Sequence, residues 1–161
     1  MKAGNLMVPL QEYLEPGMTL KEASNILRRA KRGEERHGAK GLPVLDVSGN
    51  MVGFLSIRDI LKAVFPSYMT LMDMGDFTWE GMVEDLARKA GGRTVSELMT
   101  SKVISVSVDA PLMECIDHML KNHVNKLPVL GHDGGVAGIL YEKDVFLAIT
   151  RLLDGDTGGG G

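Results

Sequence analysis

The chain has 161 residues, of which 44% are hydrophobic and 24% charged, a balance typical of a soluble globular protein. The formal net charge of −3 argues against a nucleic-acid-binding face, which is ordinarily basic, and no apolar run is long enough for a membrane span. Cys115 is the single cysteine, which excludes an intramolecular disulfide and a thiolate zinc cluster. Because the N-terminus also lacks a secretory pattern, we expect a reducing, cytoplasmic location.

Residues 1–64 are predicted to form one small α/β repeat. Thr19-x-x-Glu22 is a capping box, which indicates the start of a helix. Further along, a β-hairpin is indicated by β-branched and apolar residues on both sides of a glycine-containing turn. The elements predicted after the first helix are, in order, a strand from Pro43, a turn at Ser48-Gly49-Asn50, a returning strand and a closing helix over 57–64.

Residues 65–93 are predicted to be a methionine-rich linker that is partly helical. Its helix is expected to bury one face, formed by Met82, Val83, Leu86 and Ala87. Two interpretations apply to the methionines at 69, 72 and 74. They form either a thioether site for Cu(I) or, together with Trp79, an apolar seam or dimer contact. The second is favoured because no cysteine or histidine lies nearby.

Residues 94–154 are predicted to repeat the same order of elements. A short β-branched strand is expected over 102–108, and Asp109-Ala110-Pro111 is a helix-start signal. The helix that follows carries an apolar stripe: Leu112, Cys115, Ile116, Met119 and Leu120. The remaining predicted elements are strands over 127–130 and 136–140, joined by the turn 132–135, and a closing helix over 142–152. The glycine-rich tail 155–161 is expected to be disordered.

The two halves match residue by residue. Pro43-Val44-Leu45 is repeated 85 residues later at Pro128-Val129-Leu130 without a gap, and Leu6-Met7 is repeated 92 residues later at Leu98-Met99. The first copy therefore holds seven extra residues, for which the charged run 31–37 is the expected place. That run is interpreted as a solvated loop, with a place near a bound phosphate as the alternative. The further matched pairs are Gly49/Gly134, Gly53/Gly138, Leu55/Leu140, Asp59/Asp144 and Ala63/Ala148.

This duplication predicts the fold class, which is α/β (α+β) with two βαββα repeats. A three-stranded sheet with two helices has too small a core to be stable alone. We therefore expect the two repeats to pack sheet to sheet with pseudo-two-fold symmetry.

The ordered set of motifs resembles the cystathionine-β-synthase (CBS) domain, which occurs in tandem pairs called Bateman modules. The resemblance rests on Leu6-Met7 and Leu98-Met99, on the Gly-Leu-Pro-Val and Lys-Leu-Pro-Val segments at 41–44 and 126–129, and on the segments 53–59 and 138–144. It covers the chain except for the linker and the glycine tail. Because no nucleophile–base set or metal cluster can be assembled from the sequence, we expect that the chain is not an enzyme.

The resemblance implies a stand-alone regulatory sensor that binds AMP, ADP, ATP or S-adenosylmethionine, with or without Mg²⁺, in clefts between the paired repeats. It also implies a homodimer and an effector protein as partners, with no nucleic acid and no membrane. No cofactor is required, and no metal-binding or catalytic residue is expected. The four histidines at 37, 118, 123 and 132 show no ligand spacing.

The family's nucleotide signature, Gly-hydrophobic-x-(Ser/Thr)-x-x-Asp, assigns the first site to Ser56, Arg58 and Asp59. The implied roles are a hydroxyl and a basic side chain for phosphate and a carboxylate for the ribose hydroxyls. In the second copy Lys143 and Asp144 are present, but Tyr141 replaces the small hydroxyl residue. Ser56 and Asp59 are open to another interpretation, because Ser-x-x-Asp is also nearly a capping box that needs no ligand.

The resemblance places the adenine pocket at the start of the first strand and just before the Pro-Val segments. The residues implied are Lys40, Gly41 and Leu42 for one site and Val103, Ile104, Lys126, Leu127 and Pro128 for the other. Leu42 and Leu127 have core packing as their alternative role. A second function also stays open, that of a ligand-free dimerisation or scaffold module acting through a partner protein.

Overall fold

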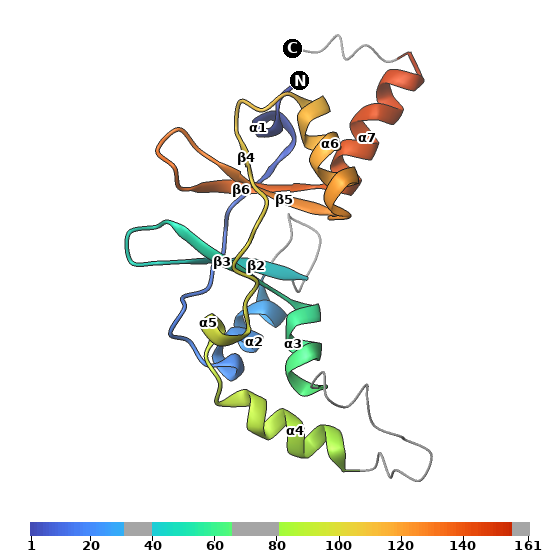
Figure 1. The fold of residues 1–161 in the computed structure, drawn as a ribbon. Coiled ribbons are helices and arrows are strands. Elements are labelled where there is room, and N and C mark those ends of the chain that lie inside the picture. The colour runs from blue at the N-terminus through green and yellow to red at the C-terminus, as the bar shows by residue number, and fades with distance from the viewer. Residues whose placement is uncertain (31–39, 66–80, 156–161) are drawn as a thin grey trace. The chain divides into compact units, whose positions relative to one another are not determined.

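The computed structural model describes residues 1–30, 40–65 and 81–155, and it divides into two compact units. One unit consists of Glu12–Val103, and the other combines Met1–Gln11 with Ile104–Gly161. Each unit joins helices to a β-sheet (Figure 1), which confirms the predicted α/β class.

The unit of residues 12–103, the first unit, is built around an antiparallel hairpin of β2 (Gly41–Leu45) and β3 (Met51–Ser56). Its turn contains Gly49 at φ 84°, a left-handed conformation that glycine adopts without a steric cost. The helices are α2 (Leu20–Arg29), α3 (Ile57–Val64), α4 (Met82–Gly91) and α5 (Val95–Leu98). The predicted turn and the predicted bounds of the closing helix are confirmed.

The amphipathic face of α2 closes the core of the first unit. Its start is the predicted capping box, in which the backbone N–H of Glu22 donates to Thr19 Oγ1 at 3.2 Å. The apolar residues that meet in the core come from the helix and from both strands of the hairpin: Leu20, Ala23, Leu27, Leu42, Val44 and Leu55. Burial of these side chains is the main favourable contribution to the stability of the unit.

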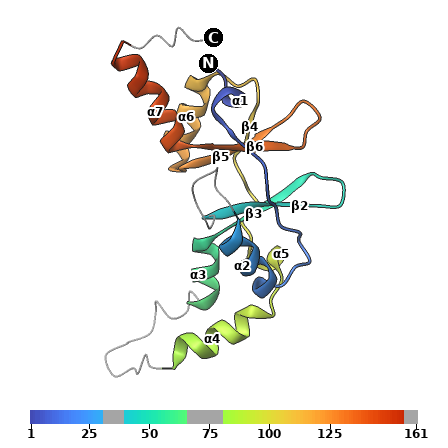
Figure 2. The same ribbon diagram turned by 180° about the vertical axis from the view of Figure 1, so that it is seen from behind.

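The second unit has a four-stranded sheet in the order β1-β6-β5-β4. Its strands are β1 (Val8–Pro9), β4 (Val106–Ser107), β5 (Lys126–Leu130) and β6 (Val136–Tyr141), and its helices are α1 (Ala3–Leu6), α6 (Leu112–Asn122) and α7 (Glu142–Leu153). Helices α6 and α7 lie side by side against the sheet (Figure 1, Figure 2). Strand β4 is parallel to β5, whereas the other pairs are antiparallel.

The strand predicted over 102–108 is much shorter in the structure. Only Val106 and Ser107 pair with β5, opposite Val129 and Leu130. The β-branched residues before them were expected to continue the ladder, but composition alone does not show where a neighbouring strand ends. The predicted length of this strand was therefore wrong, although its position was correct.

Each unit is completed by a segment that precedes the other repeat in the sequence. Strand β1 pairs with β6, with Val8 opposite Ile139, so residues 1–11 pack with the second repeat. Conversely, Phe54 of β3 and Thr100 exchange both backbone hydrogen bonds at 2.9 Å, so the segment 94–103 packs with the first repeat. The compact units thus differ from the sequence boundaries 1–64 and 94–154, because both entry segments are exchanged.

The exchanged segments lie directly against glycines. A Cβ at position 138 would clash with the Val8 carbonyl oxygen and lie 2.9 Å from Met7 Sδ. A Cβ at position 53 would lie 2.9 Å from the Thr100 carbonyl oxygen and would clash with Met99. The repeated glycine and the repeated Leu-Met pair are therefore two parts of one packing contact, which occurs once in each unit.

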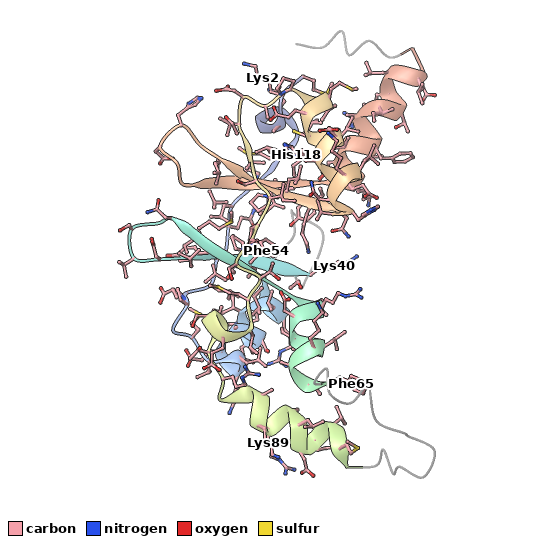
Figure 3. All side chains as sticks on the ribbon, viewed as in Figure 1. Lys2, Lys40, Phe54, Phe65, Lys89 and His118 are labelled. Carbon is pink, nitrogen blue, oxygen red and sulfur yellow. The ribbon has the colours of Figure 1, made fainter. Side chains whose placement is uncertain are left out.

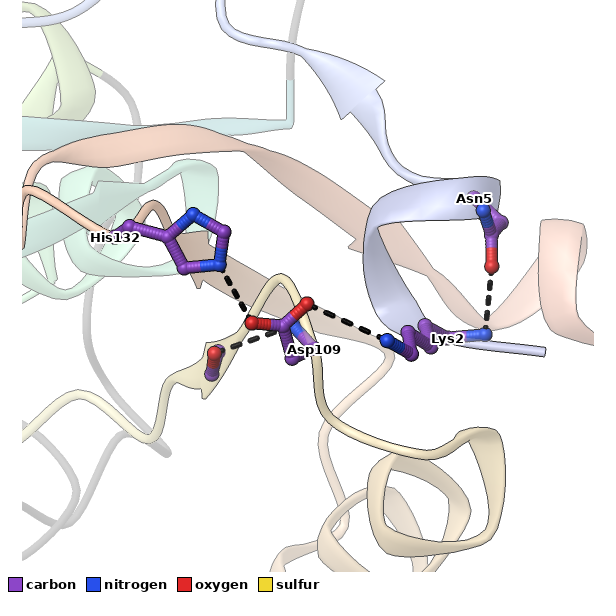
Figure 4. A network of polar contacts seen from close by, with 5 residues as sticks. Lys2, Asn5, Asp109 and His132 are labelled. Atoms are coloured by element: carbon purple, nitrogen blue, oxygen red, sulfur yellow. Dashed lines mark hydrogen bonds and ion pairs between the residues drawn. The ribbon is translucent and has the colours of Figure 1, made fainter.

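Polar contacts also hold the N-terminal segment on the second unit (Figure 4). Asp109 Oδ1 lies 3.6 Å from Lys2 Nζ, and Asp109 Oδ2 lies 2.6 Å from His132 Nε2. The hydrogen bond from His132 lowers the pKa of the Asp109 carboxyl below its ordinary value. All three side chains are exposed, so these pairs add little to stability and mainly orient the chain.

The predicted buried face of the linker helix is only half correct. Met82 and Leu86 are partly buried, but Val83 is 58% exposed and Ala87 is exposed as well. The face that turns inward on α4 continues instead to Ala90, which is buried in the core of the first unit. On α4 the second residue of each adjacent apolar pair, Val83 or Ala87, lies about 100° around the helix from the first and is exposed.

Several sequence predictions fall outside the described residues. They are the charged run 31–37, with His37, the linker methionines Met69, Met72 and Met74, Trp79, and the end of the glycine tail.

Because β1 packs directly on Gly138, we expect a side chain at this position to destabilise the second unit. Replacing Gly138 with alanine should lower the free energy of unfolding by about 1–3 kcal/mol, because β1 must move to make room for the methyl group. Equilibrium urea denaturation measures this change. Gly17→Ala is the matched control, since nothing lies within 4 Å of a Cβ at that position. Equal stability of the two variants would contradict the close packing of Met7 and Val8 on Gly138.

Candidate functional site

The signature residues of the first unit lie where β3 runs directly into α3. Ser56 is the last residue of β3 and the N-cap of α3, with φ −106° and ψ 164°. Asp59 lies in the first turn of the helix, and Arg58 beside it is exposed. Because the first N–H groups of a helix have no partner within the helix, this junction is suited to bind an anion.

Ser56 and Asp59 form a complete capping box. The Asp59 N–H donates to Ser56 Oγ at 3.2 Å, while Asp59 Oδ2 accepts from the Ser56 N–H at 2.9 Å and from Ser56 Oγ at 3.0 Å. The capping interpretation made from the sequence is thus confirmed for this pair. Both side chains remain partly exposed, so capping leaves them within reach of solvent.

Thr100 also contacts Asp59, and sequence reasoning missed it. Thr100 Oγ1 donates to Asp59 Oδ1 at 3.2 Å, across 41 residues of sequence. The contact exists because the exchanged segment 94–103 lies along β3. The only signal in the sequence is that Thr100 differs from its repeat counterpart Val8, 92 residues earlier.

Two further residues assigned to the first site meet at the same junction. Gly41 is opposite Ser56 in the hairpin, and the Lys40 carbonyl accepts a hydrogen bond from the Ile57 N–H at 2.9 Å. A Cβ on Gly41 would lie 3.0 Å from the Leu55 carbonyl oxygen, so the backbone there has no room for a side chain. Lys40 itself is exposed at the end of the hairpin from which α3 departs (Figure 3).

Leu42, assigned to the first site, and Val103, assigned to the second site but part of the first unit in the structure, contribute differently. Leu42 is 7% exposed and packs in the core, which agrees with its alternative role. Its side chain is therefore not exposed to a ligand. Val103, the last residue of this unit, is partly buried and lies outside any strand.

In the second unit the same junction is arranged without a side-chain cap. Tyr141 is the N-cap of α7, opposite Lys126 in the β5–β6 hairpin, but its side chain does not accept from the helix. Asp144 is partly exposed in the first turn, and its carboxylate makes no hydrogen bond to any residue that the structure describes. Lys143 is exposed beside it, as Arg58 is in the first unit.

Three hydrophobic residues assigned to the second site are buried or partly buried, and two of them, Ile104 and Leu127, belong to the core cluster. Leu127 is fully buried and Pro128 is buried, while Ile104 is partly buried against the same core cluster. Leu127 thus packs in the core, as the alternative interpretation held.

Within the described residues, no group of three or more His, Cys, Asp and Glu side chains is arranged to hold a metal ion. No described helix is long and apolar enough to cross a membrane.

These features define a duplicated α/β protein in which each repeat delivers a strand into a helix that begins with a Ser/Tyr-x-x-Asp segment. The family model of the CBS domain matches the chain twice, at residues 4–66 and 95–151. The chain therefore belongs to the CBS domain family and carries a tandem pair of these domains.

Curated relatives agree with this assignment. An uncharacterized protein, MJ1426, of Methanocaldococcus jannaschii is 31% identical over 68% of this chain and 72% of its own length. The chloroplastic CBS domain-containing protein CBSX2 of Arabidopsis thaliana is 27% identical over 92% of this chain, which spans only 63% of that relative.

Solved structures include two similar proteins with nucleotides. CBSX2 in complex with AMP has 25% identity and a TM-score of 0.67, over 94% of this chain and 98% of that one. The cytosolic domain of the Mg²⁺ channel MgtE in complex with ATP has 27% identity and a TM-score of 0.65, over 91% of this chain and 48% of that one.

The capping box predicts the effect of removing the Ser56 hydroxyl. Ser56→Ala should lower the free energy of unfolding by about 0.5–2 kcal/mol, because the Asp59 N–H loses its acceptor. Chemical denaturation monitored by circular dichroism provides the measurement. Ser48→Ala in the hairpin turn is the control, since only the backbone of Ser48 is hydrogen-bonded there. If the two variants were equally stable, Ser56 would not cap α3.

Proposed function

We propose that this protein is a regulatory sensor that binds an adenosyl ligand at the helix starts marked by Asp59 and Asp144. One observation carries the proposal: two carboxylates 85 residues apart occupy the same position, the first turn of a helix that directly follows a strand. Each has an exposed cationic neighbour, Arg58 or Lys143. The solved complexes of CBSX2 with AMP and of MgtE with ATP support the choice of ligand.

Each part of an adenine nucleotide has a chemical counterpart at these junctions. A carboxylate accepts hydrogen bonds from both hydroxyls of a ribose, as a vicinal diol requires. The phosphate is an anion, and the helix N-terminus together with Arg58 or Lys143 supplies positive potential for it. The hydroxyl of Ser56 already donates its single hydrogen to Asp59 Oδ2, so the phosphate is left to the backbone N–H groups of the first turn and to the cationic side chain. The backbone of Lys40 and Gly41 in one unit, and of Lys126 and Leu127 in the other, offers polar groups for the adenine edge.

The ligands proposed are the anionic nucleotides AMP, ADP or ATP. S-adenosylmethionine, which shares the adenosyl group but has a net positive charge, is the further candidate. Mg²⁺ would accompany a polyphosphate rather than bind to the protein alone. Regulation would follow if the ligand binds two conformations of the protein with different affinities. The absence of catalysis and the cytoplasmic location stay predictions from the sequence.

A second function, dimerisation or a scaffold role, is favoured by the surface of α6. Leu120, predicted as part of the apolar stripe of this helix, is 71% exposed instead, and Met113, seven residues earlier on the same face, is 75% exposed. At the corresponding positions of α2 the first repeat has the charged residues Lys21 and Arg28. Because this apolar face is not required by the repeat itself, we propose it as a contact for a second copy of the chain or an effector protein.

A thermal-shift assay on nucleotide-free protein tests the sensor function. AMP at a hundred times its dissociation constant should add about 2.7 kcal/mol to the stability of the binding unit, a rise in Tm of roughly 5–10 °C. ADP, ATP and S-adenosylmethionine, each with and without Mg²⁺, are compared under the same conditions. The ligand that binds most tightly should give the largest shift at equal concentration.

Substitutions at the two carboxylates test whether the rise in Tm comes from ligand bound at these positions. The double variant Asp59→Asn with Asp144→Asn should abolish the shift, whereas Asp117→Asn should retain it, because Asp117 is an exposed residue of α6 that pairs only with Lys121. A shift that survives in the double variant would place the ligand elsewhere. No shift with any of the four ligands would favour the scaffold function instead.

A further inference from the structure

We propose that Thr100 controls the affinity of the Asp59 site for ribose by competing with the ribose hydroxyls for the Asp59 carboxylate. This inference rests on the proposed function. It makes the two sites of the chain unequal and assigns the difference to one hydroxyl group, which the exchanged segment 94–103 brings to the first unit.

The number of hydrogen bonds that a carboxylate accepts limits what can bind to Asp59. An ionised carboxylate has about four acceptor positions, two on each oxygen. In the first unit, Asp59 Oδ2 already accepts from the Ser56 N–H and Ser56 Oγ, and Asp59 Oδ1 accepts from Thr100 Oγ1. One position is left, whereas a ribose with both hydroxyls free donates two hydrogen bonds.

One of the three donors must therefore yield before both ribose hydroxyls bind. The two donors from Ser56 belong to the capping box and are held by the start of α3. The Thr100 hydroxyl comes from another segment, is exposed, and is free to turn to water about its χ1 bond. Its hydrogen bond is therefore the one with the smallest cost of exchange.

The second unit lacks this competition. Val8 occupies the position that corresponds to Thr100, since it pairs with Ile139 of β6 just as Thr100 pairs with Phe54 of β3. Valine has no hydroxyl, and Asp144 accepts no hydrogen bond from the described residues. All acceptor positions of Asp144 are thus available to a diol, and Asp144 should distinguish ribose from deoxyribose more strongly than Asp59 does.

The experiment compares AMP with 2′-deoxy-AMP by isothermal titration calorimetry. An Asp144→Asn background isolates the Asp59 site. In that background, Thr100→Val should tighten AMP binding about two- to tenfold, the range expected for one hydrogen bond. It should leave 2′-deoxy-AMP unchanged, because a single hydroxyl fits the position that is already open. Thr100→Ser, which keeps the hydroxyl, should behave as the parent does.

The reciprocal variant is the matched control. In an Asp59→Asn background, Val8→Thr introduces the hydroxyl at the second site and should weaken AMP about two- to tenfold without affecting 2′-deoxy-AMP. Valine and threonine have the same shape, so neither variant is expected to disturb the fold.

The outcomes separate this inference from the function on which it rests. If Thr100→Val changes the affinities for AMP and 2′-deoxy-AMP by the same factor, or changes neither, the competition is refuted while nucleotide binding stands. If AMP binds only in the Asp59→Asn background, the Asp59 site does not bind nucleotide, and the inference fails with it. If AMP binds in neither background nor in the parent protein, the proposed function itself is wrong.

Discussion

The packing of a Leu-Met segment against a glycine, once in each unit, is the contact on which the rest of the structure depends. Gly53 and Gly138 leave no space for a Cβ because Met99 and Met7 lie on them. Each methionine comes from the segment that precedes the other repeat, so neither repeat completes its sheet from its own sequence alone. Each core is thereby completed by a segment from outside its own repeat.

This exchange also determines the chemistry of the candidate sites. The strand–helix junctions are alike in the two units, since β3 leads into α3 as β6 leads into α7. The residues laid beside them differ, with Thr100 in one unit and Val8 in the other. A further difference, Ser56 against Tyr141, decides whether the helix is capped by a side chain. Two copies of one motif thus present a partly occupied carboxylate and an open one.

The repeat pattern predicted most of the fold because local signals carry it. The capping box at Thr19, the hairpin turn at Gly49 and the helix 57–64 each depend on residues close together in sequence. The exchange of the entry segments and the Thr100–Asp59 contact depend on pairing between residues far apart in sequence. Hydrophobic periodicity does not predict such pairing. The inward face of α4 was misjudged for the same reason, since only the neighbouring helices decide that Ala90 rather than Val83 is buried. For the site, sequence located the carboxylates but not the hydrogen bonds that already occupy one of them.

Binding of an adenosyl ligand at the two helix starts is the proposal on which the function depends. The most direct measurement is an NMR titration of ¹⁵N-labelled protein with AMP, followed at the backbone amides. We expect saturable shifts centred on the first turns of α3 and α7, at Arg58, Asp59, Lys143 and Asp144. Shifts confined to other elements, or none at millimolar AMP, would contradict the proposal.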